Sequence, residues 1–433
     1  MQPHEQLEKF FADLVPYLKA NPAQIPEMMS EAEREFKRAG YREEIPSTVK
    51  NILIVRLDAI GDMILTSGFI REVRANFPQA RITLIASPLT FPLVELCPYV
   101  NEVLIFDRNK FVGNFTDVLE KLVVFCRENL WRKIFSIAFS PQWGSWNLPA
   151  LLLCWLSGAR ERIGFGTYPY KNYFGEPSAE ETAKDNFLLT KNIVVPQSII
   201  PDLEKYLYLL TASGFEVAQD NVELFYGAED FYRARALLKD ISCKKVILGI
   251  GAGGASRKYP VEKYLVALKE IAKKDLVFVI VGGRDELNDA NFIEKNLPVG
   301  KVLNFTGKTT LRETEAIIGQ ADFYIGNDTG VMHMAAAEKI PCLVLYREAV
   351  DKENYFPGAF SEFGRYPPWQ TKAVILRPDH QLEDCAKRGV IYGWCHSRGP
   401  HCITQIAPQE IVDAFEANAM PAKDTEQLEN EFS

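Results

Sequence analysis

The sequence lacks any apolar run long enough to cross a membrane as a helix. Its longest apolar stretch, residues 148–156, falls well short of the ~20 residues that a spanning helix needs. The first twenty residues carry Glu5, Lys9, Asp13 and Lys19, so they contain no apolar core of the kind found in secretory signal peptides. We therefore expect a cytoplasmic protein, or one held at a membrane surface without spanning it.

An excess of positive charge is also missing. The 433 residues include 49 lysines and arginines against 57 aspartates and glutamates, which gives a net charge of -8. Proteins that bind nucleic acid generally present a basic face, so this balance argues against nucleic acid as a partner. It leaves room for a local basic pocket.

The eight cysteines contain no C-x-x-C pair. Three of them cluster near the C-terminus beside two histidines: Cys385, Cys395 and Cys402, with His396 and His401. Without such a pair, free thiols are favoured there over a metal site, and we expect no bound metal. Four others lie in apolar stretches and are expected to be buried free thiols: Cys97, Cys126, Cys154 and Cys243.

The sequence does contain strand and helix patterns in alternation. A hydrophobic content of 47% with 24% charged residues is that of a globular protein, and the length suggests two or three domains. The first set of predicted strands covers residues 52–55, 82–86, 102–106, 134–139 and 162–165. Predicted helices cover 64–77, 115–129, 148–156 and 202–212, with an extended segment at 223–225. This alternation predicts a parallel sheet covered on both faces.

The alternation restarts after a linking helix over residues 227–240. The second set of predicted strands covers 245–250, 276–281, 323–325 and 342–346, with helices at 261–273, 311–319, 330–338 and 408–418. We therefore predict an α/β fold with two Rossmann-like domains. Four regions follow from this division: a helical N-terminal extension over 1–49, domains over 50–226 and 227–420, and a disordered tail over 421–433.

The first turn of the first domain carries two candidate carboxylates. A buried strand ends at Arg56 and is followed by Asp58, Gly61 and Asp62 at the start of a helix. Ligands of open α/β sheets bind at this carboxyl edge. Asp62 is placed to take a proton from a substrate hydroxyl, although a capping role alone would also explain it. Asp58 is the weaker candidate, because it can cap the helix or pair with Arg56.

A second turn, GNDTG at residues 326–330, leads from a strand into a helix. Free backbone N–H groups at a helix start attract anions, and Gly330 lets a phosphate approach the backbone closely. Thr329 can donate its hydroxyl, while Asp328 can cap the helix or accept from sugar hydroxyls. An ordinary N-cap would explain the same residues.

The loop GAGGASRKYP at 251–260 adds glycines and two cations just before a helix. Gly253 and Gly254 expose backbone donors, and Ser256, Arg257 and Lys258 follow them. This pattern is typical of a diphosphate cradle, although it lacks the Walker A spacing and a flexible surface loop remains the alternative. The next strand ends in GGRDE at 282–286, where Asp285 is a further candidate for nucleotide binding.

Three stretches together resemble the bacterial heptosyltransferases of glycosyltransferase family 9. RLDAIGDMILTSGFIREVRANFPQARITLIAS resembles the N-terminal motif of that family, and FTGKTTLRETEAIIGQADFYIGNDTGVMHMAAAEKIPCLVLY resembles its donor-binding stretch. Between them, SRKYP resembles its lysine-containing loop. The resemblance runs in order from about residue 51 to 418 and leaves residues 1–49 uncovered.

The resemblance implies a GT-B architecture, with two facing Rossmann-like domains that bind the acceptor and the nucleotide sugar respectively. It further implies metal-independent, inverting transfer of heptose from ADP-heptose to a lipopolysaccharide-core or related glycan acceptor, without a cofactor. A lipid-linked or core oligosaccharide acceptor would bring the protein to the cytoplasmic face of the inner membrane as a peripheral contact.

Site residues follow from the resemblance position by position. Asp62 matches the catalytic aspartate, and Lys258 matches the lysine that contacts donor phosphate. The donor-binding motif falls on Asp328, Thr329 and Gly330, with His333 on the helix that follows. Family members often place hydroxyl side chains where this sequence has Gly253 and Gly254. Candidates for acceptor binding in the first domain are Asp58, Gly61, Arg160, Arg162 and Lys171.

Two alternatives remain open. The protein can be a GT-B transferase that uses another nucleotide sugar or a protein acceptor, since the glycines before the lysine depart from the family pattern. It can also be a catalytically idle scaffold that binds sugar nucleotides, although the joint presence of Asp62, Lys258 and the turn at 328–330 speaks against this. An NAD-dependent oxidoreductase is disfavoured, because no G-x-G-x-x-G follows the first strand.

Overall fold

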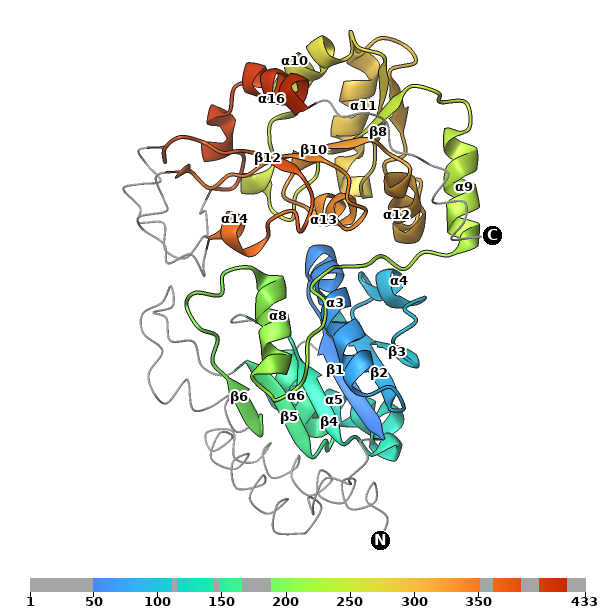
Figure 1. Ribbon diagram of the computed structural model, residues 1–433, viewed down its shortest axis with the longest axis vertical. Helices are drawn as coiled ribbons and strands as arrows, with labels where there is room; N and C mark the ends of the chain where they lie inside the picture. The colour runs from blue at the N-terminus through green and yellow to red at the C-terminus, as the bar shows by residue number, and fades with distance from the viewer. Residues whose placement is uncertain are drawn as a thin grey trace. The chain divides into compact units, whose positions relative to one another are not determined.

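The computed structural model describes residues 50–110, 115–143, 148–165, 188–350, 361–382 and 397–418 (Figure 1). Several predictions lie outside these ranges: the extension over 1–49, the loop that holds Lys171, the tail over 421–433, and Cys385, Cys395 and His396. The chain divides into two compact units. The first comprises Met1–Ala59, Gly68–Pro196 and Leu203–Asp220, and the second comprises Ile60–Ser67, Gln197–Asp202 and Asn221–Ser433.

The first unit is built on a six-stranded sheet in the order β3-β2-β1-β4-β5-β6, with every pair of neighbours parallel. Its strands are β1 (Asn51–Arg56), β2 (Arg81–Ala86), β3 (Glu102–Ile105), β4 (Ile137–Ser140), β5 (Glu161–Phe165) and β6 (Lys191–Ile193). The register aligns Ile52 of β1 with Ile82 and with Ile137. The strand order reverses between β1 and β4, which is where ligands of doubly wound sheets bind.

Helices cover both faces of this sheet because its strands are apolar on both sides. The helices are α3 (Ile60–Asn76), α4 (Phe91–Val94), α5 (Phe115–Asn129), α6 (Leu148–Leu156) and α8 (Asp202–Thr211). Leu53 and Val55 of β1 pack in one core with α5 and α6. On the other face, Phe69 of α3 makes an edge-to-face contact with Phe139 of β4, with ring centroids 5.6 Å apart.

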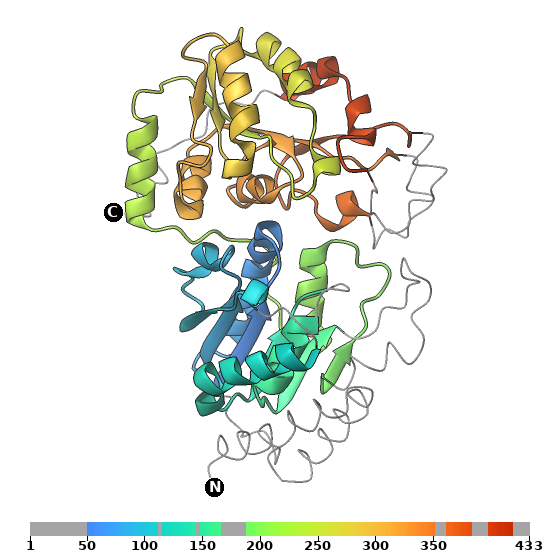
Figure 2. The same cartoon turned by 180° about the vertical axis from the view of Figure 1, so that it is seen from behind.

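The second unit repeats this plan in the order β12-β11-β10-β7-β8-β9, again with parallel neighbours (Figure 1). Its strands are β7 (Lys244–Gly249), β8 (Leu276–Ile280), β9 (Val302–Asn304), β10 (Phe323–Asn327), β11 (Cys342–Leu345) and β12 (Ala373–Leu376). Its helices are α9 (Ala228–Leu238), α10 (Val261–Ile271), α11 (Leu287–Asn296), α12 (Leu311–Gly319), α13 (Gly330–Ala337), α14 (Glu362–Arg365) and α16 (Pro408–Asn418). Figure 2 shows α10 and α16 together on one side of this sheet, where Leu268 and Phe415 join the core. These two parallel sheets confirm the predicted α/β fold class.

Most predicted elements form close to their predicted bounds, and the differences have local causes. Helix α3 begins at Ile60 rather than at residue 64, because Gly61 is accommodated within the first helical turn. Strand β4 begins at Ile137 rather than at 134, because a 3₁₀ turn over Trp131–Lys133 ends at Ile134 in the left-handed region, with φ of 49°. The segment 223–225, predicted as extended, pairs with no strand in the described sheets.

The structure tests the predictions made for the cysteines and for membrane-spanning helices. Cys97, Cys126 and Cys154 are buried free thiols as predicted, and Cys402 is one too, whereas Cys243 is only half-buried. None of the helices in the described ranges combines the length and the apolar character that a membrane crossing requires.

Candidate functional site

The carboxyl edge of the second sheet is organised by Asn327, the last residue of β10, which is fully buried. Its amide nitrogen donates to the carbonyl oxygens of Ile250 and Gly251, at 3.0 Å each. Its amide oxygen accepts from the backbone N–H of Tyr259 at 3.2 Å and from the hydroxyl of Tyr264 at 3.0 Å. Asn327 therefore fastens the glycine loop after β7 to the end of β10. The sequence analysis gave this residue no such role.

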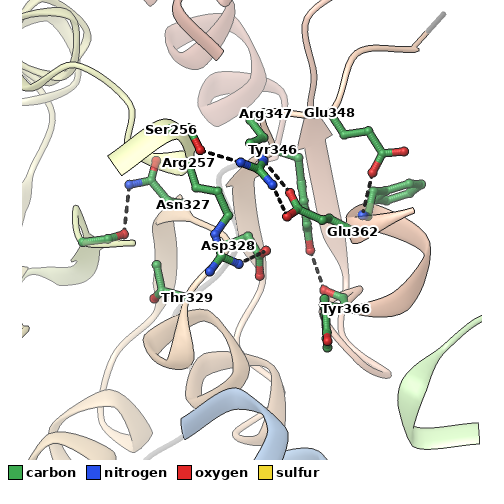
Figure 3. A network of polar contacts seen from close by, with 12 residues as sticks. Ser256, Arg257, Asn327, Asp328, Thr329, Tyr346, Arg347, Glu348, Glu362 and Tyr366 are labelled. Carbon is green, nitrogen blue, oxygen red and sulfur yellow. Dashed lines mark hydrogen bonds and ion pairs between the residues drawn. The ribbon is translucent and has the colours of Figure 1, made fainter. Parts of the chain in front are cut away.

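Asp328 follows at the same edge and lies against the basic loop (Figure 3). Its Oδ2 is 3.4 Å from Nη1 of Arg257, which belongs to the 3₁₀ turn η4 (Ala255–Arg257). Burial raises the pKa of Asp328 to about 7, and the attraction of Arg257 works against this rise. The structure thus brings together two residues that the sequence predicted separately, and the carboxyl group of Asp328 can hold or release a proton near neutral pH.

Thr329 and Gly330 form the start of α13, the predicted anion site. The hydroxyl of Thr329 caps the helix by accepting from the N–H of Val331 at 3.0 Å. His333 lies one turn further along α13 and is 4% exposed. Burial, assisted by Arg257, lowers the pKa of His333 to about 4, so its imidazole is neutral at pH 7.

The Nδ1 atom of His333 is buried and finds no hydrogen-bond partner among the described residues. Buried polar atoms in folded proteins are nearly always satisfied, so an orphan beside a helix start marks a place for a ligand group. Together with the capped start of α13, this observation favours a polar ligand at the turn.

Lys258 ends the same basic loop and pairs with a carboxylate that the sequence analysis missed. Its Nζ is 2.5 Å from Oδ2 of Asp289, in the first turn of α11. Both side chains are more than a quarter exposed, at 29% and 27%. The ammonium group of Lys258 is therefore held at the surface of the site, where an incoming anion can reach it.

The two glycines of the loop play different parts. A Cβ atom at Gly253 would lie 2.5 Å from Nη2 of Arg257, so a larger residue there would collide with the guanidinium as placed. A Cβ atom at Gly254 would meet nothing within 4 Å. The absence of a side chain at Gly253 thus leaves the space that the guanidinium of Arg257 occupies.

The acid of the turn at 282–286 that lies against the glycine loop is Glu286, and Asp285 is not near these glycines. A Cβ atom at Gly251 would lie 2.8 Å from Oε1 of Glu286, and one at Gly282 would lie 3.2 Å from Oε2. Gly282 has φ of 158°, a value that side chains rarely adopt. The carboxylate of Glu286 therefore lies over a glycine surface at the ends of β7 and β8, whereas Asp285 is exposed on η5 (Arg284–Glu286).

A third cation, Arg347, completes the network in Figure 3 and was also missed. It follows β11, and its Nε donates to Oε2 of Glu362 in α14 at 2.7 Å, while Nη2 donates to Oε1. Its Nη1 donates to the hydroxyl of Ser256. The sequence signal was present, since charged residues directly follow an apolar strand that ends at the same edge.

Two further hydrogen bonds attach α14 to the end of β11. The hydroxyl of Tyr346 donates to the carbonyl oxygen of Tyr366 at 2.6 Å. The N–H of Phe363 donates to Oε2 of Glu348 at 3.2 Å. Helix α14 has only four residues, and these contacts and the Arg347–Glu362 pair help to hold it at the end of β11.

The candidates of the first predicted domain stand at the end of β1. Asp62 is the third residue of α3, and the N-cap of that helix is Ala59, whose side chain makes no capping bond. Asp58 pairs with Arg56 at 3.1 Å, as one alternative expected. The same guanidinium donates to the hydroxyl of Tyr206 at 2.7 Å, so Asp58 belongs to a structural cluster. Gly61 lies beside Asp62 within the first turn.

The two predicted acceptor-binding arginines have different surroundings. Arg162 is fully buried, and its guanidinium donates to the carbonyl oxygens of Leu188 at 2.7 Å and Ala159 at 3.2 Å. This arrangement gives Arg162 a structural role in place of the expected exposure to an acceptor. Arg160 is half-buried at the start of the same strand region and stays a candidate.

Comparison with known proteins places this site in context. The family model described as glycosyltransferase family 9 (heptosyltransferase) matches residues 178–394, half of the chain. The lipopolysaccharide core heptosyltransferase OpsX of Haemophilus influenzae is 22% identical over 341 residues, which cover 75% of this chain and 90% of that protein.

Solved structures are similar over most of the chain. A family 9 glycosyl transferase from Veillonella parvula superposes with a TM-score of 0.66 at 18% identity, covering 87% of this chain and 98% of the other. The Escherichia coli heptosyltransferase WaaC with ADP-2-deoxy-2-fluoro heptose has a TM-score of 0.57 at 15% identity, covering 85% and 99%. These similarities confirm the predicted GT-B fold.

Proposed function

The chain belongs to glycosyltransferase family 9, and from this premise we propose that it moves a heptose from ADP-heptose to a lipopolysaccharide-core or related glycan acceptor. The transfer would invert the anomeric carbon and need neither metal nor cofactor. The family description and the name of the Haemophilus influenzae relative support heptose as the sugar. The donor-analogue complex of the Escherichia coli relative supports ADP as the nucleotide.

The observation that carries this proposal is the turn from β10 into α13. It combines a threonine-capped helix start, the orphan Nδ1 of neutral His333 and the paired Asp328. A helix start with free N–H groups suits a phosphate, and polar side chains around it suit sugar hydroxyls. We assign the diphosphate to the N–H groups at Thr329 and Gly330, and sugar or ribose hydroxyls to Asp328, His333 and Glu286.

Lys258 would stabilise the leaving group. When the bond between the anomeric carbon and the diphosphate oxygen breaks, negative charge accumulates on that oxygen. Fixed cations and N–H groups aimed at developing charge can do what a metal ion does in other transferases. The side chain of Lys258 is 29% exposed, so an incoming phosphate can approach its ammonium group.

Asp62 would act as the general base. Its carboxylate would take the proton of the acceptor hydroxyl while the hydroxyl oxygen attacks the anomeric carbon, and ADP would leave on the opposite side. We propose that water is excluded from the site while Asp62 acts, because water would otherwise hydrolyse the sugar nucleotide. Arg160 is proposed to contact anionic groups of the acceptor.

The acceptor chemistry sets the proposed location. A lipid-linked or core oligosaccharide would be met at the cytoplasmic face of the inner membrane, so we propose a cytoplasmic enzyme with peripheral contact there. The alternatives differ in testable ways. Another nucleotide sugar or a protein acceptor would change the substrate but keep the residues, whereas an idle scaffold would bind the donor without turnover.

A panel of nucleotide sugars tests the donor. A ligand that binds only the folded state stabilises it by about 2.7 kcal/mol at a hundredfold excess over its Kd. We expect ADP and ADP-heptose to raise the melting temperature, and UDP- and GDP-sugars to leave it unchanged. Stabilisation by another nucleotide alone would refute the ADP assignment. Binding of ADP-heptose without transfer to deacylated core oligosaccharides would favour the scaffold or a different acceptor.

A further inference from the structure

Figure 3 shows two neighbouring pairs of opposite charge at the carboxyl edge of the second sheet, Arg257 with Asp328 and Arg347 with Glu362. We propose that Arg347 is a positioning residue of the donor site: by occupying Glu362, it keeps Arg257 paired with Asp328, and by holding Ser256 it fixes the basic loop. This inference rests on the proposed function, because it takes the turn at Asp328 to be the place where the nucleotide sugar binds.

The contacts of Arg347 are suited to this task. Its guanidinium meets both carboxylate oxygens of Glu362, an arrangement that fixes geometry as well as charge. The side chains are only 12% and 18% exposed, so water screens the pair weakly. Arg347 thereby compensates the charge of Glu362 and occupies both of its oxygen atoms with hydrogen bonds.

Arg257 is the neighbouring cation that Glu362 would otherwise attract. The charges of both Asp328 and Glu362 act on Arg257 and raise its pKa against the effect of burial, so both carboxylates lie within electrostatic reach of it. Its hydrogen bond goes to Asp328 alone among the described residues. If Arg347 lost its charge, Glu362 would be the more poorly compensated carboxylate and would compete for Arg257.

Arg347 also acts on the loop through Ser256. Ser256 is the middle residue of the turn η4 and is buried at 7% exposure. Its hydroxyl accepts from Nη1 of Arg347, and the next two residues are Arg257 and Lys258. By holding Ser256, the guanidinium of Arg347 therefore fixes the backbone from which the side chains of Arg257 and Lys258 extend.

Four variants test the proposal, with isothermal titration of ADP and steady-state kinetics with ADP-heptose. We expect Arg347→Gln to raise the Kd for ADP and the donor KM about tenfold, with a smaller change in kcat. Glu362→Gln removes the competing charge but leaves an amide that can still bond to Arg347, so it should raise both constants less than Arg347→Gln does. The double variant Arg347→Gln/Glu362→Gln should recover most of the affinity, because no surplus carboxylate then competes for Arg257.

A matched control separates positioning from lost stability. Arg312 pairs with Asp230 at 3.1 Å in the same unit, on α12 and α9, and its side chain is also partly buried, at 26% exposure. Arg312→Gln should lower the melting temperature to a similar degree as Arg347→Gln without changing the Kd for ADP. Weakened ADP binding in both variants would show a general structural effect and would overturn the proposal.

The pH profile supplies a second readout. The groups that interact electrostatically with Asp328 come from several elements: Arg257, Arg347, Glu362, Tyr324 and Tyr346. Loss of the charge of Arg347 leaves Glu362 as an uncompensated like charge near Asp328, so the acid limb of donor binding should move to higher pH. The double variant should return it toward the wild-type position.

Two outcomes would overturn the inference while leaving the proposed function intact. In the first, the wild type binds ADP and the Arg347→Gln variant shows the same Kd and the same pH profile. In the second, the double variant binds ADP as weakly as Arg347→Gln does. Competition by Glu362 would then not be the cause of the weakened binding. A wild type that binds no ADP would refute the proposed function, and with it the inference.

Discussion

The two sheets share one strand order but differ at their carboxyl edges. Counted within each unit, both run 3-2-1-4-5-6 with parallel neighbours. At the first edge, buried cations lie over aromatic rings: the guanidinium of Arg56 is 4.4 Å from the ring centroid of Tyr206, and Nζ of Lys205 is 3.9 Å from that of Trp143. At the second edge, the cations pair with carboxylates around a capped helix start.

This difference shows what topology decides and what it leaves to the residues. The strand order places an opening at the end of the central strands in both sheets. The residues that follow those strands then give one edge cations stacked on aromatic rings, and the other a network of ion pairs suited to polar ligands. The fold alone therefore does not identify the function, which has to be inferred from the residues of the site, because one fold can support many reactions.

The largest effect is expected from the turn after β1. Asp62→Asn keeps the size of the side chain but removes the base, so kcat should fall by about 10²- to 10⁴-fold while the Kd for ADP stays within about twofold. Steady-state kinetics and calorimetry measure the two constants. Asp117→Asn is the matched control, because Asp117 also lies in the first turn of a helix, α5. The Asp117→Asn variant should have normal activity. Unchanged turnover in Asp62→Asn would refute the base assignment.

The second edge offers a pH-dependent effect through His333. Because burial lowers the pKa of His333 from 6.5 to about 4, the unfolded chain binds a proton in this range that the folded chain does not. The stabilising contribution is therefore complete above pH 6.5 and is lost as the pH falls to about 4. The loss is on the order of 3 kcal/mol.

Urea unfolding at a series of pH values measures this contribution. His333→Gln should flatten the decline in unfolding free energy between pH 6.5 and 4, whereas the same substitution at the exposed His380 should leave it unchanged. A decline that persists in full in His333→Gln would mean that other groups cause it.

A somewhat smaller effect is expected from Lys258. Lys258→Ala removes a cation proposed to stabilise the leaving diphosphate, so kcat/KM for ADP-heptose should fall about 10²-fold. Lys269→Ala, at an exposed position in the last turn of α10, is the control and should be neutral. A dependence on donor concentration equal to that of the wild type would count against the role of Lys258.

The smallest effect compares two helix caps of the second unit. Thr329 caps α13 and Thr310 caps α12, each by accepting a backbone N–H bond. Each Thr→Ala substitution should cost about 1 kcal/mol of unfolding free energy. Only Thr329→Ala should also weaken ADP binding, since only that helix start is proposed to hold phosphate. Equal ADP affinity in both variants would place the phosphate elsewhere.

The sequence predicted those parts of the molecule that depend on local pattern. The apolar strands and the glycine-containing turns lie where their spacing indicated, and Thr329 caps the predicted helix. Short elements were missed because they are too short to show a period: β6 and β9 have three residues each. The start of α3 was misplaced because Gly61 suggested a turn where the helix had already begun.

Side-chain partners from distant segments could not be predicted. Glu286 was passed over for Asp285, because one position along a 3₁₀ turn decides which acid faces the glycines. Asp289 and Glu362 carry ordinary surface charges in the sequence, and only folding brings them to Lys258 and Arg347. Arg162 seemed available to a ligand until the fold placed it among backbone carbonyl groups.

The four hydrogen bonds of Asn327 have a consequence for evolution and engineering of this site. They use every donor and acceptor of the amide inside the protein, so the scaffold of the turn is complete before a ligand arrives. Neighbouring positions can then change to suit a new sugar without moving the backbone that presents them. Libraries that vary Asp328, His333 and Glu286 while keeping Asn327 should retain folded proteins and alter donor preference.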